Sequence, residues 1–245
     1  MKSIFVGVQQ LVRPHLHEIH TYQRLYPKRP VPEQRRTPSA LETWKNYVRA
    51  MITSQQLISE DLWARLDADP RWRALRNGGP RSCPSERSLA SLFRDQRIRF
   101  PGQKAARVKR AQGRDFEALG SLSRSILRDA HDRRARSEKL RAEEVRLAVA
   151  FQEELAGCGV APKIARLAIR FTGEFEQLVP IDSRWVNALS AVGVDVAQSE
   201  LAREVSYVAL ENEIARAAYH LSVPPSLADG AVFGWVGRSI AGVTQ

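Results

Sequence analysis

The stretch GCGVAPKIARLAIRFTGEFEQLVPIDSRW, residues 157–185, decides the fold. It opens on a glycine-containing turn and continues into a helix with an apolar stripe that starts at Lys163. A short loop then leads to a second helix, which starts after Asp182, 19 residues beyond Lys163. This arrangement can bring an amine and a carboxylate together beside a backbone turn that suits phosphate. The stretch therefore favours chemistry on nucleic acid.

Helical spacing of apolar residues continues outward from this stretch over most of the chain. The pattern predicts helices at 41–52 and 86–97, a basic helix at 103–110, and two more helices within 197–240. Residues 77–85, NGGPRSCPS, are typical of a loop. The sequence contains no internal repeat and no useful run of alternating β-branched residues. The prediction is an all-α fold.

The first 40 residues differ from the rest. Pro27, Pro30, Pro32 and Pro38 stand among lysine and arginine residues, a composition typical of an extended segment. We therefore expect an irregular basic arm at 1–40 and a helical domain at 41–245, with a hairpin at about 155–165.

No metal site is expected. Cys83 and Cys158 are the two cysteines, too few for a disulfide framework or a four-cysteine zinc or iron–sulfur site. The spacing of His15, His17 and His20 matches no helical i, i+4 ligand pair, so a polar surface segment is favoured over a metal site there. No organic cofactor is expected either.

The charge balance indicates an anionic partner. The 38 Lys and Arg against 27 Asp and Glu give a net charge of +11, in a chain with 43% hydrophobic residues. Such an excess favours nucleic acid over anionic lipid when no amphipathic anchor stands out. A protein that is basic without a polyanion partner is the alternative. The opening MKSIFVGVQQLV is too short and polar for a secretory or membrane segment. We expect a soluble cytoplasmic monomer, associated with the nucleoid if bacterial.

Around residues 157–190 the sequence resembles the helix-hairpin-helix DNA glycosylases. Gly-Val-Ala-Pro-Lys-Ile-Ala at 159–165 and Val-Pro-Ile-Asp at 179–182 are similar to the Gly-Val-Gly-x-Lys hairpin and Val-Pro-Val-Asp loop of the 8-oxoguanine DNA glycosylase branch. Looser similarity covers 44–110, in Met-Ile-Thr-Ser-Gln-Gln and Phe-Pro-Gly-Gln-Lys-Ala. The resemblance implies a two-lobed helical fold with double-stranded DNA lying across the cleft between the lobes.

The resemblance also implies roles for single residues. Lys163 would be the nucleophile and Asp182 its partner carboxylate, and Gln55 or Gln56 would fill the gap left by an extruded base. Composition alone suggests that Phe233 and Trp235 stack on that base. DNA contacts are further implied for Gly157, Gly159, Ala161, Arg184, Lys104 and Arg107.

Elementary chemistry agrees with these roles. A lysine amine can attack C1′ of the sugar, expel the base and leave a Schiff base. A carboxylate can stabilise the positive charge that develops on the sugar and shuttle protons. Backbone N–H groups at a helix start can hold a phosphate oxygen, and Gly157 and Gly159 permit the positive φ values that such a turn needs.

Several positions depart from the family pattern. Ala161 replaces the second hairpin glycine, so its φ must be negative or strained. Cys158 stands where proline is common, and Arg184 where many relatives have histidine. The chain lacks the four-cysteine cluster of the endonuclease III branch, and we expect no β-rich extra domain at its N-terminus. The excised base is therefore open, with 8-oxoguanine as first candidate and another modified base, such as one in foreign DNA, as second.

Simpler interpretations of the same residues stay open. Lys163 could be a surface or phosphate-contacting lysine, Asp182 a helix N-cap, and Gln55-Gln56 an ordinary helix end. A non-catalytic DNA-binding protein that keeps the hairpin is the second hypothesis. A transcription regulator is weaker, because no recognition helix stands apart from the basic helix at 103–110. The leading hypothesis is a DNA glycosylase with AP lyase activity.

Overall fold

The computed structural model describes residues 3–25, 39–53, 60–132, 138–171 and 175–234. These segments contain helices and no strand, so the all-α prediction is confirmed. The chain divides into two compact units. Unit 1 takes its residues from 1–35, 134–145 and 175–245, and unit 2 from 36–133 and 146–174. Helix α9 (Glu138–Glu154) contributes residues to both units.

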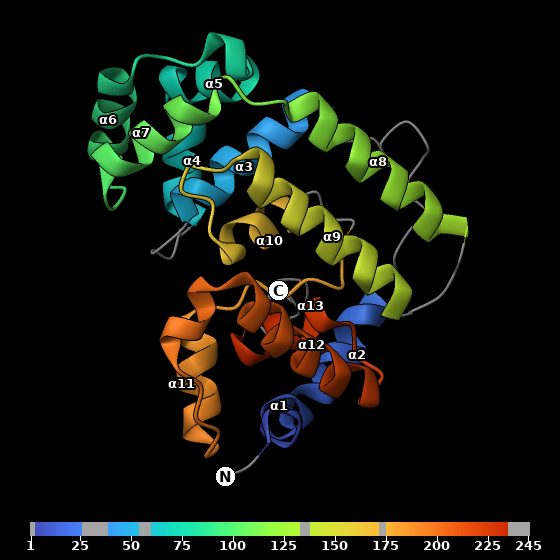
Figure 1. Ribbon diagram of the computed structural model, residues 1–245. Coiled ribbons are helices and arrows are strands. Elements are labelled where there is room, and N and C mark those ends of the chain that lie inside the picture. Colours follow the sequence, from blue (N-terminus) through green and yellow to red (C-terminus); the bar gives the residue numbers. More distant parts are fainter. Residues whose placement is uncertain (1–2, 26–38, 54–59, 133–137, 172–174, 235–245) are drawn as a thin grey trace. The chain divides into compact units, whose positions relative to one another are not determined.

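In unit 2, helix α3 (Ala40–Thr53) is central, with α5, α7, α8 and α10 packed against it (Figure 1). Its buried face carries Trp44, Tyr47, Val48 and Met51 at helical spacing. The Trp44 indole N–H donates a 3.0 Å hydrogen bond to the Leu75 carbonyl oxygen, which ties α3 to α5. The other elements of the unit are α4 (Glu60–Ala68), α5 (Pro70–Asn77), the 3-10 turn η3 (Pro80–Ser82), α6 (Glu86–Asp95), α7 (Pro101–Ala111), α8 (Phe116–Asp132) and α10 (Pro162–Arg170).

Unit 1 joins N-terminal and C-terminal helices around an apolar core. Helices α1 (Ile4–Val12) and α2 (Leu16–Leu25) lie beside α12 (Glu204–His220) and α13 (Pro225–Val232) (Figure 1). Val8, Val12, Ile19 and Trp185 are fully buried in this core. Trp185 comes from α11 (Ser183–Ala191), and the 3-10 turns η1 (Arg13–His15) and η4 (Gln198–Ala202) complete the unit.

The prediction of an irregular arm at 1–40 is wrong for residues 4–25. Ser3 caps α1 by accepting a 3.4 Å hydrogen bond from the Val6 N–H, and Val8 and Val12 are buried one helical turn apart. Burial of this apolar face stabilises the helix. The domain boundary expected at 41 is wrong for the same reason, because these residues belong to the core of unit 1. The proline-rich part, 26–38, lies outside the described residues.

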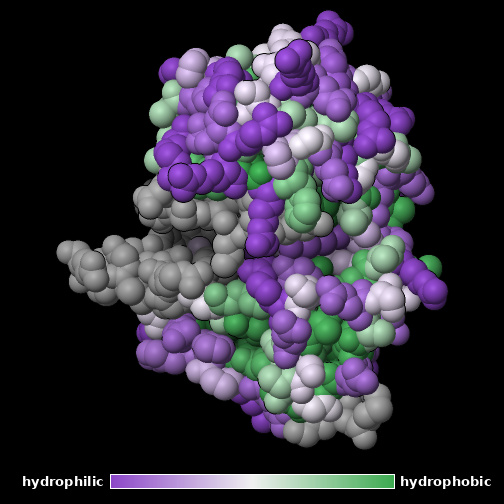
Figure 2. Space-filling model, turned by 90° about the vertical axis from the view of Figure 1, so that its left-hand side faces the viewer, coloured by the Kyte–Doolittle hydropathy of each residue, from purple (hydrophilic) through white to green (hydrophobic). Residues whose placement is uncertain are grey.

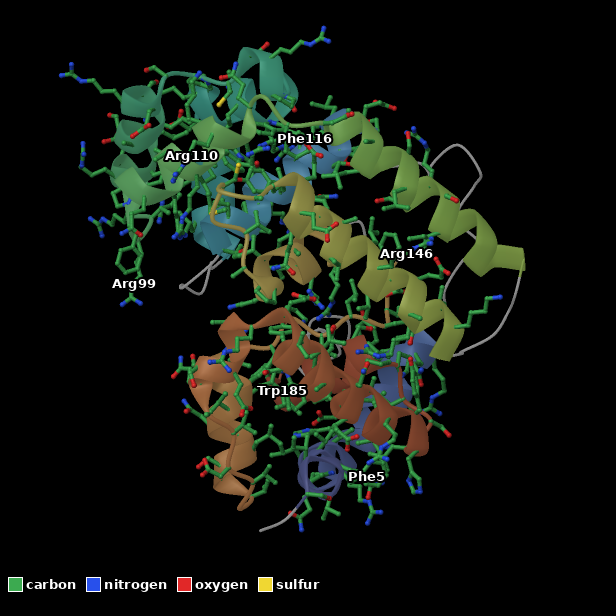
Figure 3. All side chains as sticks on the ribbon, viewed as in Figure 1. Phe5, Arg99, Arg110, Phe116, Arg146 and Trp185 are labelled. Carbon is green, nitrogen blue, oxygen red and sulfur yellow. The ribbon has the colours of Figure 1, made fainter. Side chains whose placement is uncertain are left out.

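The described surface of unit 2 is basic around α6 and α7. Figure 2 shows that hydrophilic side chains dominate this face. Arg94 and Arg97 are exposed there, and Arg99 extends away from the helices (Figure 3). Among the helices described, none has both the length and the apolar character that a membrane span requires.

Candidate active site

The turn between α9 and α10 has the backbone conformation of a helix hairpin. Gly157 and Gly159 have φ values of 77° and 73°, in the left-handed region that glycine adopts without strain. Ala161, the N-cap of α10, has a φ of −81° and a ψ of 165°. Of the two alternatives that the sequence left open, a negative or a strained φ, the structure has the negative one, and no strain arises. Alanine provides no side-chain cap, and N–H groups at such a helix start can bind a phosphate oxygen.

Side chains of unit 2 hold this hairpin. A Cβ on Gly159 would overlap the Arg107 side chain of α7, so the missing Cβ lets this arginine lie against the turn. Arg114 donates a 2.7 Å hydrogen bond to the Ala156 carbonyl oxygen. A Cβ on Gly157 would meet no atom within 4 Å. Both glycines therefore serve the positive φ of the turn, and Gly159 also permits the close contact with Arg107. The DNA contacts expected of Arg107 and of these glycines stay predictions.

Lys163 is the second residue of α10 and is half-buried. The two residues after it, Ile164 and Ala165, are buried in the core. Lys163 thus stands at the border between core and surface, in the first turn after the hairpin, as the sequence predicted. Its charge acts on a second lysine, Lys104 of α7.

The prediction that Lys104 contacts DNA is wrong, because this side chain is fully buried. Its Nζ donates a 2.9 Å hydrogen bond to the Ile52 carbonyl oxygen, in the last turn of α3. The carbonyl groups at a helix C-terminus lack partners and attract a cation. Burial lowers the pKa of Lys104 from its ordinary 10.5 to about 8, with smaller effects from the charges of Arg107, Arg99 and Lys163.

Asp182 is the N-cap of α11, and its side chain is 14% exposed. It accepts a 2.9 Å hydrogen bond from the Arg184 backbone N–H, a contact typical of Asp at this position. The Arg184 guanidinium also grips the carboxylate, with Nε 3.1 Å from Oδ1 and 3.0 Å from Oδ2, and Nη2 2.9 Å from Oδ2. The N-cap interpretation is confirmed, and the catalytic role of Asp182 stays a prediction.

Phe233 belongs to the same cluster in unit 1. The Arg184 guanidinium carbon lies 4.3 Å from the centre of the half-buried Phe233 ring. The ring meets Trp185 edge-to-face, with centroids 5.8 Å apart. The Trp185 indole N–H donates a 2.8 Å hydrogen bond to buried Asp229, and Figure 3 shows Trp185 among the helices of unit 1. Phe233 and the Asp182 carboxylate thus contact the same guanidinium, that of Arg184.

Two buried residues of α12 hold the extended segment before Asp182, and sequence reasoning missed both. The Val179 N–H donates to Glu211 Oε1 at 2.8 Å, and the Ile181 N–H donates to the Tyr207 hydroxyl at 2.6 Å. That hydroxyl donates in turn to the Val179 carbonyl oxygen at 3.0 Å. The available signal was an acid on the apolar face of α12, four residues after Tyr207.

Three predicted site residues, Gln55, Gln56 and Trp235, lie outside the described residues. Lys163 belongs to unit 2 and Asp182 to unit 1. The predicted meeting of the amine and the carboxylate therefore stays a prediction, as do the DNA contacts of Ala161 and Arg184.

The part of the chain that the structure describes contains no group of three or more His, Cys, Asp or Glu side chains that could hold a metal ion.

Two solved structures share this fold. The 8-oxoguanine DNA glycosylase of Thermotoga maritima matches with a TM-score of 0.61 and 14% identity, over 92% of this chain and 97% of that one. The 8-oxoguanine DNA glycosylase of Methanocaldococcus jannaschii matches with a TM-score of 0.57 and 12% identity, over 94% of this chain and 92% of that one.

No protein-family model matches the sequence, and no curated protein gives a significant match. At identities this low, the structural similarity establishes the fold alone: the chain has the all-α fold of the two glycosylases. The resemblance inferred from residues 157–190 is thereby confirmed at the level of the fold.

Proposed function

We propose that this protein is a DNA glycosylase that removes a damaged or modified base and then cleaves the abasic strand through a Schiff base on Lys163. The observation that carries the proposal is the position of Lys163, in the first turn of the helix after a hairpin with two positive-φ glycines. The fold shared with two 8-oxoguanine DNA glycosylases supports it. So does the net charge of +11, because basic proteins are attracted to the DNA backbone.

In the proposed first step, the Lys163 amine forms a bond to C1′ while the bond from C1′ to the base breaks. The bonding electrons leave with the base, which takes up a proton. The C1′–O4′ bond then opens, O4′ takes up the proton that the bound amine nitrogen gives up, and an iminium links Nζ to C1′. Loss of a proton from C2′ expels the 3′ phosphate by β-elimination, and water finally releases the lysine.

Asp182 is proposed to stabilise the positive charge that the sugar carries as the base departs. A carboxylate that caps α11 has a fixed place, since the Arg184 N–H holds it from one side. Glu211 and Tyr207 restrain the backbone just before it. A preorganised charge acts without a reorganisation cost at the moment of reaction.

An oxidised purine, 8-oxoguanine first, is the proposed substrate. The two similar structures are both 8-oxoguanine DNA glycosylases by name. Another modified base, for example one carried by foreign DNA, is the alternative. It is favoured by the departures at Ala161 and Arg184.

A panel of duplexes, each with one lesion, tests the glycosylase step. Base release is scored by strand cleavage after alkali, which detects abasic sites whether or not the enzyme cleaves them. Asp182→Asn keeps a good N-cap residue and is compared with Asp195→Asn, at an exposed position of the same unit. We expect release by the wild type and Asp195→Asn, slowed by about 100-fold or more in Asp182→Asn. No release from any duplex would overturn the proposal.

A non-catalytic DNA-binding protein is the second candidate function. The ion pair between Arg184 and Asp182 favours it, because a carboxylate held by an arginine is neutralised. Under this candidate, Asp182→Asn leaves DNA affinity unchanged, and none of the duplexes loses a base.

A further inference from the structure

The positive charge of the chain is concentrated in one segment. Residues 70–114, from the start of α5 to the turn after α7, contain 13 Lys and Arg against two Asp and Glu, a net charge of +11. The rest of the chain has 25 of the 38 Lys and Arg and 25 of the 27 Asp and Glu, so it is neutral as a whole. The long-range attraction of this protein for a polyanion therefore originates in helices α5 to α7 of unit 2.

Helix α6 presents part of this charge on one side. Arg87 and Arg94 are exposed and lie two helical turns apart, with the half-buried Ser91 between them. The three buried residues of the helix are apolar and lie on its opposite side. Arg97, which is also exposed, follows in the turn after the helix. We call Arg87, Arg94 and Arg97 the arginine face.

Acidic side chains do not neutralise the arginine face. Asp95, in the last turn of α6, pairs with Arg71 at 2.8 Å, so its charge is already offset. Glu86 is the other acid of the segment, and it lies in the first turn of α6, where the helix dipole favours a negative charge. In the part of the chain that the structure describes, no acid forms an ion pair with the three arginines of the face.

Arg97 has a backbone conformation that suits glycine. Its φ is 57°. The Ile98 N–H donates a 2.7 Å hydrogen bond to the Phe93 carbonyl oxygen, and the Arg97 N–H donates one of 2.9 Å to the Arg94 carbonyl oxygen. These two bonds form a Schellman motif, in which the left-handed residue is usually glycine. A side chain costs stability at this position, and strain of this kind indicates that the Arg97 side chain serves a contact.

Arg97 also lines a hollow of about 350 Å³ at the C-terminal end of α6. Arg65 of α4, Asp95 and Gln96 line the same hollow. Arg65 and Arg97 are both exposed. A phosphate oxygen in this hollow would meet two guanidinium groups and an amide, which are groups that commonly contact the backbone of nucleic acids.

We propose that the arginine face binds the sugar–phosphate backbone of double-stranded DNA, with or without a lesion, at a place apart from the proposed reaction site. Helix α7 packs on α6 and on α3, and α3 packs on α10, which carries Lys163. Figure 1 shows α6 at the outer edge of unit 2. The inference goes beyond the proposed function and does not depend on it, because a phosphate contact requires no chemistry at Lys163.

The residues of α6 favour a duplex over other polyanions. Proteins that bind single strands use exposed aromatic side chains on which the bases stack, and the aromatic residue of α6, Phe93, is buried. A helix that lies on a membrane needs an exposed apolar side, whereas the apolar side of α6 is buried in the protein. Arginine side chains at helical spacing with a serine between them suit a phosphate backbone.

The salt dependence of binding to an undamaged duplex tests the inference. The face variant is full-length protein with Arg87→Gln, Arg94→Gln and Arg97→Gln. The control variant carries Arg13→Gln, Arg203→Gln and Arg216→Gln, at three exposed arginines of unit 1. Both variants lower the net charge from +11 by three, so a general charge effect would change them equally.

The slope of log affinity against log salt should fall by about 2.7 in the face variant, about 0.9 for each lost phosphate contact. Between about 50 and 200 mM salt, the wild type should therefore lose about 40-fold more affinity than the face variant. The control variant should keep a slope close to that of the wild type. An unchanged slope in the face variant, or the same fall in both variants, would overturn the inference. So would a larger loss of affinity for the RNA duplex of the same sequence than for DNA, because the partner would then be RNA.

Arg97→Gly separates a DNA contact from a structural role. Glycine adopts the left-handed conformation without strain, so the urea midpoint should rise. The affinity for the undamaged duplex should fall by roughly two- to fivefold, the scale of one exposed ionic contact. A residue with a structural role alone would not lower the affinity while it raised the stability. Unchanged affinity in Arg97→Gly would remove Arg97 from the face.

Base release distinguishes this inference from the proposed function. The face variant should lose the same factor of affinity for lesion and undamaged duplexes, since phosphate contacts carry no sequence information. Its single-turnover rate on a released lesion, at saturating enzyme, should stay within about twofold of the wild type. A large fall in that rate with unchanged affinity would place the arginines in the reaction site and overturn the inference. A protein that releases no base but shows the change in slope loses the proposed function and keeps the arginine face.

Discussion

The Glu211 carboxylate accepts a 2.8 Å hydrogen bond from the Val179 N–H, so a buried acid of α12 holds the segment that leads to Asp182. Glu211 is fully buried and faces Arg141 of α9 at 3.7 Å. Arg141 donates a 2.7 Å hydrogen bond to the Gln177 carbonyl oxygen, at the start of the same segment. In a β-sheet a neighbouring strand would bond the backbone groups of an extended segment, and here the side chains of Glu211 and Arg141 bond them instead. The Val179 N–H and the Gln177 carbonyl oxygen would otherwise be buried without partners.

Replacing Glu211 by Gln should destabilise unit 1. The change removes the negative partner of a buried arginine, and breaking a buried ion pair from one side costs about 3 kcal/mol of unfolding free energy. Urea denaturation measures the loss. The control is Glu213→Gln, whose pair with Arg216 is partly exposed, with an expected change within about 0.5 kcal/mol. Equal midpoints for the two variants would show that the buried pair of Glu211 with Arg141 does not stabilise unit 1.

Stability between pH 7 and pH 10 should depend on Lys104. Its pKa is about 8 in the folded protein, against an ordinary 10.5. Between these values the unfolded chain binds more protons, so Lys104 makes the unfolding free energy rise as the pH rises through this window. Below about pH 8 both states carry the proton, and this contribution does not change with pH.

The comparison is between the wild type and Lys104→Met, whose side chain does not titrate. Urea midpoints at several pH values should show the wild type gaining stability over the variant above pH 8, by at most about 1.4 kcal/mol for each pH unit. Tyr47 and Cys83, whose pKa values are raised mainly by burial, are present in both proteins and cancel. Parallel curves over the whole range would rule out a buried Lys104 with a lowered pKa.

The two hairpin glycines should respond differently to alanine. Gly157→Ala should lower the free energy of unfolding by about 1 kcal/mol, because alanine must adopt a left-handed conformation there. Nothing further is lost, since the space around the added Cβ is open. Gly159→Ala meets the same cost and also overlaps Arg107, which adds about 1 to 3 kcal/mol. Urea denaturation should therefore show that Gly159→Ala is less stable than Gly157→Ala. Adding Arg107→Ala should recover part of the loss in Gly159→Ala and none in Gly157→Ala. Additive effects in both pairs would contradict the contact.

The sequence predicts local features of the site well. The positive φ of the hairpin glycines and the capping by Asp182 each depend on residues a few positions apart. Spacing of apolar residues predicts α10 for the same reason, since a helical stripe is local information. These features required no knowledge of what packs against them.

Long-range partners explain what the sequence did not predict. Lys104 has the composition of a surface DNA contact, and its burial depends on the Ile52 carbonyl, 52 residues away. Glu211 reaches across 32 residues to Val179. In residues 4–25, Val8 and Val12 have the spacing of a helix, but the proline-rich composition of residues 26–38 favours an irregular arm when 1–40 is considered as one segment.

Borohydride trapping on a lesion or abasic duplex tests the central claim, that the Lys163 amine forms a Schiff base with DNA. Reduction should give a covalent protein–DNA adduct in the wild type and in Lys139→Gln, a control at an exposed lysine. The adduct should be absent in Lys163→Gln, and peptide mass spectrometry should place the crosslink on Lys163. An undiminished adduct in Lys163→Gln, or no adduct from a wild type that releases the base, would contradict the claim.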